Sequence, residues 1–226
     1  MSRILKDIYS DITIAPLLGL KGGTCAFFFY DLPRFSVDLD FDLLQPDQGN
    51  AELVADKVSD ILKAYGQIKD SYVKKNTIFM LLSYGEEDHN VKIEISNRAT
   101  SFALKDCYEL KEYLGISILA AKRDYLLSGK LAALALRKVT AARDVYDVHF
   151  FTKDSFEFNE KALSFYTGKS VKESLADCVR IIENIPDNRI LQGLGELLNE
   201  EEKKRVKKSL KADTIFLLRS VIASSE

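Results

Sequence analysis

Three aspartates alternate with apolar residues in the segment VDLDFDLL, residues 37–44. Successive side chains of a β-strand point to opposite faces, so Asp38, Asp40 and Asp42 would share one face. The first two would lie roughly 7 Å apart at Cα. Because hard cations such as Mg²⁺ prefer carboxylate oxygens, this spacing indicates metal ligands at Asp38 and Asp40, with Asp42 further along the same face.

The alternative is an ordinary amphipathic strand whose acidic side lies in water. Three aspartates on one short strand repel each other, and aspartate is depleted in strands. A bound divalent cation would relieve that repulsion. The metal-binding interpretation is therefore favoured over the solvated strand.

A glycine pair, Gly22 and Gly23, is followed by Thr24 and an apolar segment. Backbone N–H groups at such a helix start can bind phosphate, since glycine lets the anion approach closely. A plain turn capped by Thr24 explains the tripeptide equally well by itself. Gly23 stands 15 residues before Asp38, however, and the two features together indicate a metal-dependent site for a nucleoside triphosphate.

Glu94 lies in a second expected strand, residues 90–96, on the same face as Lys92. If this strand neighbours the aspartates, Glu94 could ligate the metal or accept a proton from an attacking hydroxyl. A surface ion pair with Lys92 or Arg98 is an equal alternative, and both stay open.

Lys130 and Asp147 delimit a third group, which includes Arg143 and Asp144. Seventeen residues of unbroken helix would separate Lys130 from Asp147 by roughly 25 Å, too far to serve one triphosphate. A shared role therefore requires a break, and the β-branched pair at residues 139–140 is the expected place. Otherwise these charges only flank an Ala/Leu-rich core helix.

The remaining candidates are weaker. His89 lies in an acidic turn and is expected to be solvated, and His149 is expected to pack within a helix. The basic run at residues 203–211 is bracketed by acids and favours a solvated helix face over nucleic-acid binding. The sequence has no Walker P-loop and no Gly-x-Ser-x-Gly elbow.

Composition fits a cytoplasmic protein with a sizeable core. The 226 residues are 46% hydrophobic and 29% charged, and the net charge of −2 provides no global field for nucleic acid. Three widely spaced cysteines form neither a disulfide framework nor a zinc site, as expected in a reducing compartment. No membrane-spanning segment or signal peptide is predicted.

The predicted elements divide the chain into an α+β region, residues 1–100, and a helical C-terminal domain, residues 101–226. Strands are expected at 34–44, 78–84 and 90–96, and short helical segments within 2–20. Further helices are expected over 24–30, 51–65, 104–113, 116–127, 129–138, 142–151, 159–165, 171–182, 189–198 and 200–223.

The segment LKGGTCAFFFYDLPRFSVDLDFDLL resembles the first motif of AbiEii/AbiGii-type nucleotidyltransferase toxins. That motif runs Gly-Gly-Ser/Thr, a spacer, then Arg-x-Ser-x-Asp-Leu-Asp-Phe. The later segment KLAALALRKVTAARDVYD is similar to the family's Lys-x-x-Ala-Leu…Arg-Asp-x-x-Asp motif. The resemblance spans residues 21–151.

The resemblance implies a polymerase-β-like nucleotidyltransferase core, a small mixed sheet with flanking helices, followed by a helical domain. It implies an enzyme that moves a nucleoside monophosphate from an NTP to an acceptor hydroxyl. Mg²⁺ would be the cofactor, and Mn²⁺ could replace it. The acceptor would be RNA, in particular the 3′ end of tRNA. Such proteins act as toxins in toxin–antitoxin or phage-defence systems, with an antitoxin as partner.

Carried to this sequence, the family's motifs assign two sets of residues. The catalytic set would comprise Asp38, Asp40, Glu94, Lys130 and Asp147, with the metal on Asp38 and Asp40. The nucleotide and phosphate set would comprise Gly22, Gly23, Thr24, Arg34, Ser36 and Lys130. A nucleotidyltransferase for small, antibiotic-type molecules, and an inactive protein-binding module on the same fold, remain alternatives.

Overall fold

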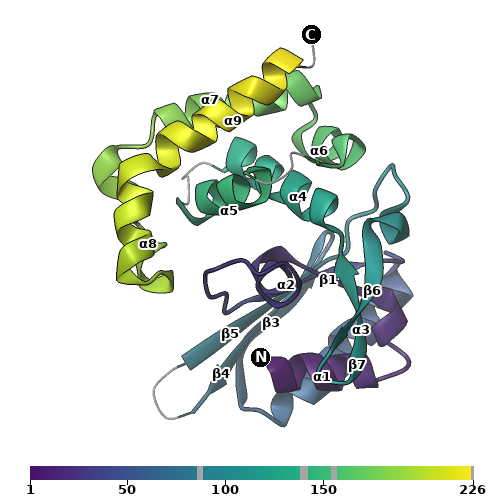
Figure 1. The fold of residues 1–226 in the computed structure, drawn as a ribbon. Helices are drawn as coiled ribbons and strands as arrows, with labels where there is room; N and C mark the ends of the chain where they lie inside the picture. Colours follow the sequence, from purple (N-terminus) through teal and green to yellow (C-terminus); the bar gives the residue numbers. More distant parts are fainter. Residues whose placement is uncertain (86–88, 138–141, 154–156, 225–226) are drawn as a thin grey trace. The chain divides into compact units, whose positions relative to one another are not determined.

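The protein forms two compact units in the computed structural model, which describes residues 1–85, 89–137, 142–153 and 157–224 (Figure 1). The first unit comprises Met1–Asp31 and Ser36–Lys122. The second comprises Leu32–Phe35 and Arg123–Glu226. The short segment Leu32–Phe35 therefore belongs by its contacts to the second unit, although both its flanks belong to the first.

A seven-stranded mixed sheet organises the first unit, in the order β3-β4-β5-β2-β1-β7-β6. Its strands are β1 (Leu18–Lys21), β2 (Leu39–Leu43), β3 (Gln67–Lys74), β4 (Thr77–Tyr84), β5 (His89–Ser96), β6 (Tyr108–Tyr113) and β7 (Ile116–Ala121). Strand β2 pairs antiparallel with β1 and parallel with β5. The aspartate strand is thus central in the sheet.

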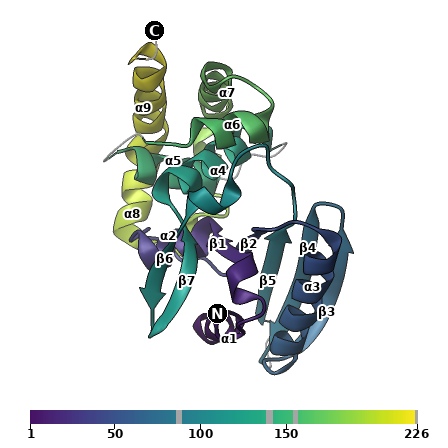
Figure 2. The ribbon, with the colours of Figure 1, turned by 90° about the vertical axis from the view of Figure 1, so that its right-hand side faces the viewer.

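Helices α1 (Ser2–Ser10) and α3 (Gln48–Lys63) contribute to the core of the first unit, and α3 lies along β3 and β4 (Figure 2). The side chain of Asp47 caps α3 by accepting a hydrogen bond from the backbone N–H of Asn50. Alternating residues of β4 and β5, such as Ile78 and Ile93, are buried on the core face. Helix α2 (Gly22–Phe29) follows β1 directly.

The second unit is helical. It contains α4 (Arg123–Leu136), α5 (Ala142–Thr152), α6 (Glu160–Thr167), α7 (Val171–Glu183), α8 (Glu200–Arg205) and α9 (Lys211–Ser224). A π-helical turn, Val206–Leu210, joins α8 to α9. Helix α4 contacts α5, α6 and α7, and α7 lies beside α9 (Figure 1).

Several predicted elements are confirmed. The helices expected at 51–65 and 171–182 correspond to α3 and α7, and the strands expected at 78–84 and 90–96 correspond to β4 and β5. Within the described residues, no helix combines the length and apolar character needed to cross a bilayer.

Other predicted elements are wrong. Residues 104–113 and 116–127 were expected to be helical, but they contain β6 and β7, which pair with each other, while β7 also pairs with β1. This ladder overrides the helix propensity of the Leu, Lys and Glu residues in YELKEY. Residues 2–20 include β1 as well as α1, β3 was not predicted, and residues 189–198 form only short 3₁₀ turns.

Candidate active site

The three aspartates of the alternating segment occupy different environments. The strand expected over 34–44 begins only at Leu39, so Asp38 directly precedes β2 and Asp40 lies within it. Asp42 is buried, and its two carboxylate oxygens lie 2.6 Å from Lys21 Nζ and 2.6 Å from the Tyr108 hydroxyl. This satisfied carboxylate supports the sheet, whereas Asp38 and Asp40 are partly accessible.

Glu94 stands beside the aspartates, because β5 pairs with β2 and Glu94 lies directly opposite Asp40. The Lys92 ammonium lies 3.5 Å from a carboxylate oxygen of Asp38 and 3.5 Å from one of Glu94. Glu94 therefore neighbours the aspartates and also faces Lys92, and its role as a metal ligand or proton acceptor stays a prediction.

The charges around Lys92 show that the carboxylates converge. Partial burial acts to lower the pKa of Lys92, but the negative charges of Asp38, Asp40 and Glu94 outweigh it and raise that pKa above its ordinary value. All three carboxylates therefore act on one cationic group.

The donor set fits a magnesium ion. Mg²⁺ is usually held by one or two protein carboxylates, with waters and substrate phosphates completing its shell. Across the described part of the chain, no group of three or more His, Cys, Asp or Glu side chains is arranged to hold a metal ion. The site would therefore rely on two carboxylates, with water and substrate phosphates as the remaining ligands. Asp38 and Asp40 would hold the ion, with Glu94 nearby.

The beginning of α2 is built around the same carboxylates. Gly22 has φ +74°, and a Cβ atom there would lie 2.3 Å from Oδ2 of Asp40, so only glycine fits. The Thr24 hydroxyl donates a hydrogen bond to the backbone carbonyl of Asp38. No side chain caps the first turn of α2, which leaves its N–H groups available to an anion at the positive end of the helix.

The second group of predicted residues meets within the helical unit. Asp147 of α5 is fully buried, and its two oxygens accept hydrogen bonds from Arg34 Nε and Nη2, both at 2.5 Å. The ammonium of Lys130 on α4 lies 2.7 Å from Asp147 and 3.7 Å from Asp144. Arg137 lies 3.0 Å from Asp144.

The distance argument from the sequence is supported by this cluster. Helix α4 ends at Leu136 and α5 begins at Ala142, so Lys130 and Asp147 come together rather than lying at the two ends of one rod. The break expected at residues 139–140 itself lies outside the described residues. Burial acts to raise the pKa of Asp147, but the charges of Lys130 and Arg34 outweigh it and lower that pKa.

The predicted residues thus form two groups, one in each unit. Gly22, Gly23, Thr24, Asp38, Asp40 and Glu94 belong to the first, and Arg34, Lys130 and Asp147 belong to the second. Ser36 lies between Arg34 and Asp38 and is half-buried. Arg34 is 3% exposed with its guanidinium on Asp147, and its role toward phosphate stays a prediction.

Two charged residues were not recognised as members of these groups. The sequence indicates Lys92 only as a partner for Glu94, although its position two residues earlier on the same strand face brings it to the carboxylates as well. Arg137 follows α4, and nothing in its local sequence indicates its pairing with Asp144.

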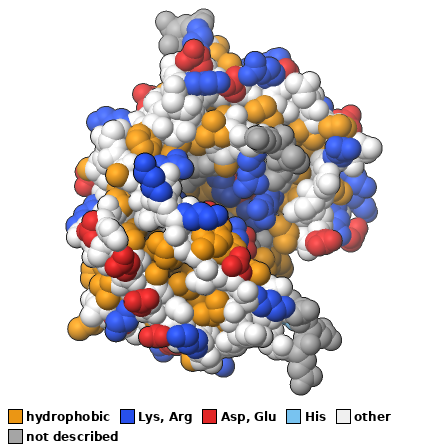
Figure 3. All heavy atoms as spheres, turned by 180° about the vertical axis from the view of Figure 1, so that it is seen from behind, with side chains coloured by type: hydrophobic (Ala, Val, Ile, Leu, Met, Phe, Trp, Pro, Cys, Tyr) orange, Lys and Arg blue, Asp and Glu red, His pale blue; other side chains and the backbone are white. Residues whose placement is uncertain are grey.

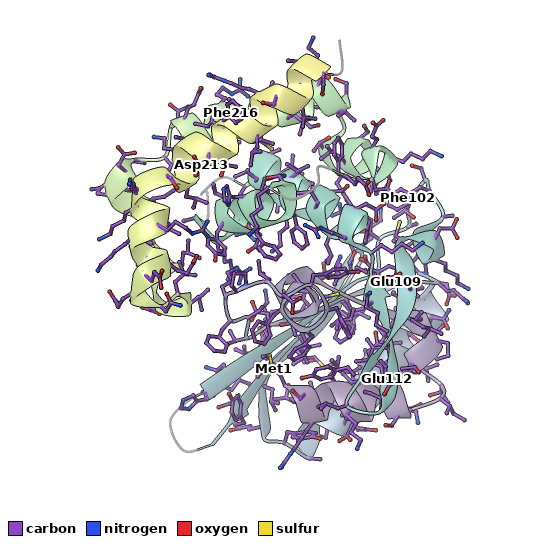
Figure 4. All side chains as sticks on the ribbon, viewed as in Figure 1. Met1, Phe102, Glu109, Glu112, Asp213 and Phe216 are labelled. Carbon is purple, nitrogen blue, oxygen red and sulfur yellow. The ribbon has the colours of Figure 1, made fainter. Side chains whose placement is uncertain are left out.

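The histidines lie where they were expected. His89 is exposed at the beginning of β5, and His149 is buried on α5. Asp213 of α9, labelled in Figure 4, has an oxygen 4.0 Å from His149 Nε2. Burial and the positive charge of Arg205 lower the pKa of His149, with Asp213 opposing them, so this imidazole is mainly neutral at pH 7.

Comparisons with known proteins agree on one fold. A Helicobacter pylori protein assigned as a nucleotidyltransferase is 18% identical, with a TM-score of 0.58 over 100% of this chain and 94% of its own. JHP933 from Helicobacter pylori is 19% identical, with a TM-score of 0.56 over 99% of this chain and 91% of its own. No curated protein sequence matches the chain.

The sequence itself identifies the family. A family model described as the nucleotidyl transferase AbiEii toxin of type IV toxin–antitoxin systems matches residues 3–219. That match spans both units, the glycine pair, the acidic strand and the cluster around Asp147. The chain therefore belongs to the AbiEii family of nucleotidyltransferase toxins.

Proposed function

We propose that this nucleotidyltransferase moves a nucleoside monophosphate from an NTP to a hydroxyl of RNA, the 3′ end of tRNA in particular, in the cytoplasm. The observation that carries the proposal is the convergence of Asp38, Asp40 and Glu94 on the ammonium of Lys92. Carboxylates gathered on one cation provide the environment that a divalent ion with a triphosphate requires.

In the proposed reaction, an oxygen of the acceptor hydroxyl attacks the α-phosphorus of the NTP. The bond from that phosphorus to the bridging oxygen breaks, and pyrophosphate leaves. A magnesium ion on Asp38 and Asp40 would supply charge neutralisation and activation of the hydroxyl. Glu94, which lies opposite Asp40, would accept the hydroxyl proton.

Binding of the triphosphate would use two further elements of this chain. The uncapped N–H groups at the start of α2 would donate hydrogen bonds to phosphate oxygens. Lys130, held by Asp147, would offer its ammonium to the triphosphate and help to stabilise the charge of the leaving pyrophosphate. Asp147 would act through Lys130 and Arg34, which makes it a positioning residue.

A basic stretch of the helical unit supports RNA as the acceptor. Lys203 pairs with Glu200 and Arg205 with Glu202, whereas Lys204, Lys207 and Lys208 are exposed and make no ion pair within 4 Å among the described residues. Their i, i+3, i+4 spacing brings them to one side of the helix. Such ammonium groups can contact phosphates. On the face of the molecule shown in Figure 3, Lys and Arg side chains are interspersed with Asp and Glu, so contact with RNA would depend on local patches rather than on a uniformly basic surface.

The test is transfer of label from α-³²P-labelled NTPs to total RNA or, separately, to a mixture of small hydroxylated metabolites. We expect labelled RNA in the presence of MgCl₂ and none with excess EDTA. Asp38→Ala should abolish labelling without unfolding the protein, because Asp38 lies outside the core. Asp60→Ala, a substitution of an exposed aspartate on α3, is the matched control and should keep full activity.

Three results would contradict the proposal. Label on small metabolites but not on RNA would indicate a small-molecule nucleotidyltransferase. Full activity in Asp38→Ala would exclude the metal site described above, and absence of Mg²⁺-dependent NTP binding by calorimetry would indicate an inactive binding module. Co-expression with the neighbouring open reading frames, which should include an antitoxin that restores growth, tests the toxin role.

A further inference from the structure

The sheet face that carries Asp40 and Glu94 continues onto two aromatic residues. Phe79 of β4 lies directly opposite Glu94, and Tyr72 of β3 lies directly opposite Phe79. Together with Asp40, these side chains form one row across four neighbouring strands, because residues paired in register point to the same face.

The two rings are stacked on each other. Their centroids are 4.9 Å apart, and their planes differ by 13°. The ammonium of Lys74 lies 4.2 Å from the centroid of the Tyr72 ring. This end of the row therefore combines an aromatic pair with a positive charge.

These rings are not part of the hydrophobic core. The neighbours of Phe79 along β4, Ile78 and Met80, point to the opposite face and are 1% and 2% exposed. Phe79 and Tyr72, in contrast, remain partly exposed, as does Glu94 beside them. The stacked pair therefore offers a partly exposed aromatic surface on the same face as the carboxylates.

We propose that Phe79 and Tyr72 form the platform on which bases at the single-stranded 3′ end of the RNA acceptor stack, with Lys74 contacting an adjacent phosphate. The proposal rests on the proposed function and adds where its acceptor binds. Single-stranded nucleic acid is bound by this combination of aromatic rings and basic side chains, largely without sequence preference.

Strand spacing agrees with this placement. Neighbouring strands lie about 4.8 Å apart, so Phe79 is two strands, or about 10 Å, from Asp40. That is about the extent of one nucleotide. A terminal ribose hydroxyl near Asp38 and Asp40 would therefore place the bases next to it over the β4 and β3 part of the face.

The test compares variants in two assays. The first measures binding of a fluorescein-labelled single-stranded RNA oligonucleotide ending in a free 3′ hydroxyl, by anisotropy without NTP. The second measures KM for RNA and KM for NTP in the transfer reaction. We expect Phe79→Ala and Tyr72→Ala each to weaken oligonucleotide binding and raise KM for RNA about tenfold, with KM for NTP unchanged.

Conservative and matched variants separate stacking from structure. Phe79→Tyr and Tyr72→Phe keep a ring and should behave like wild type. Phe216→Ala removes another exposed aromatic side chain, which is 70% exposed on α9 and labelled in Figure 4, and should leave both assays unchanged. Circular dichroism and thermal unfolding confirm that each variant is folded.

The outcomes distinguish a failure of the aromatic platform from a failure of the proposed nucleotidyl transfer to RNA. If wild type transfers no nucleotide to any RNA, the proposed function fails. If wild type labels RNA and the alanine variants bind oligonucleotide and label it as wild type does, the platform is wrong and the function stands. Equal losses for RNA and NTP would also overturn the platform, because they indicate general damage to the sheet. If this face bound a protein but no RNA, the platform would also be wrong.

Discussion

Arg34 and Asp147 form a bidentate salt bridge across 113 residues of sequence, with both side chains almost completely buried. Arg34 lies four residues before Asp38, in the segment Leu32–Phe35 that belongs to the helical unit. The salt bridge therefore holds the chain immediately before the acidic strand. Lys130 approaches the same carboxylate, so Asp147 balances two cations.

Removing this carboxylate should strongly destabilise the helical unit. Asp147→Asn keeps the size of the side chain but removes the carboxylate that pairs with both Arg34 and Lys130 in a buried place, and leaves them only the more distant Asp144, which Arg137 also approaches. We expect a loss of about 3–5 kcal/mol in the free energy of unfolding, measured by urea denaturation. Glu183→Gln breaks an exposed pair with Arg219 and should cost less than about 1 kcal/mol. Similar losses in the two variants would contradict a special role for Asp147.

The carboxyl group of Asp147 should also determine part of the loss of folding stability at low pH. The folded-state pKa of Asp147 is lowered by Lys130 and Arg34 despite burial, so the unfolded chain binds its proton more readily than the folded protein does. The stabilisation that the ionised Asp147 provides is complete above the pKa of the unfolded chain, about 3.9, and is lost as pH falls through the lower pKa of the folded protein. We expect urea midpoints of wild type to fall more steeply below pH 4 than those of Asp147→Asn.

Lys92 should compete with the metal ion. Its ammonium neutralises Asp38 and Glu94 in the structure, and a cation bound to these carboxylates would have to share them with it. Lys92→Gln should therefore lower the half-saturating Mn²⁺ concentration about fivefold, as measured by titration without NTP, since a partly exposed ion pair contributes roughly 1 kcal/mol.

The control for this titration is Lys111→Gln, which removes a lysine that pairs with Glu109 on β6. Its half-saturating concentration should equal that of wild type. Weaker Mn²⁺ binding in Lys92→Gln would contradict the competition, because it would mean that the lysine organises the carboxylates rather than opposing the metal.

Gly22 should be needed for more than its backbone conformation. In Gly22→Ala, the new Cβ would lie 2.3 Å from the present position of Asp40 Oδ2, so the carboxylate must move. In Gly115→Ala, φ is +76° but no atom of the described residues lies within 4 Å of the added atom. Both variants should lose about 1–2 kcal/mol from backbone strain. Only Gly22→Ala should also lose nucleotide transfer, and equal activity in the two would show that Asp40 does not depend on this contact.

The sequence predicted those features of the site that depend on the spacing of nearby residues. The alternation around Asp38 and Asp40 indicated their common face, and the length of an unbroken helix showed that Lys130 and Asp147 need a break in order to meet. Nothing local indicates the Arg34–Asp147 pair, because its partners are distant in the chain. The pairing of β7 with β1 is equally distant in the chain. Strand β6 pairs with β7 across the two-residue turn Leu114–Gly115, but its Leu, Lys and Glu residues favour a helix.

The three aspartates should differ in a way that their spacing does not reveal. Asp42 compensates Lys21 inside the sheet and accepts a hydrogen bond from Tyr108, so Asp42→Asn should cost about 3 kcal/mol of stability. Among the described residues, the carboxylate of Asp38 makes only a long ion pair with Lys92 and lies among like charges, so Asp38→Asn should leave stability unchanged or slightly higher.

Metal binding should show the opposite order. Asp38→Asn should remove most Mn²⁺ binding, whereas Asp42→Asn, tested at a temperature where it is folded, should keep a half-saturating concentration within about twofold of wild type, because both oxygens of Asp42 are already occupied by Lys21 and Tyr108. A variant series in which stability and metal binding fall together at both positions would mean that the acidic face acts as one structural unit. The crossed result would instead separate the carboxylate that supports the sheet from the one that serves the reaction.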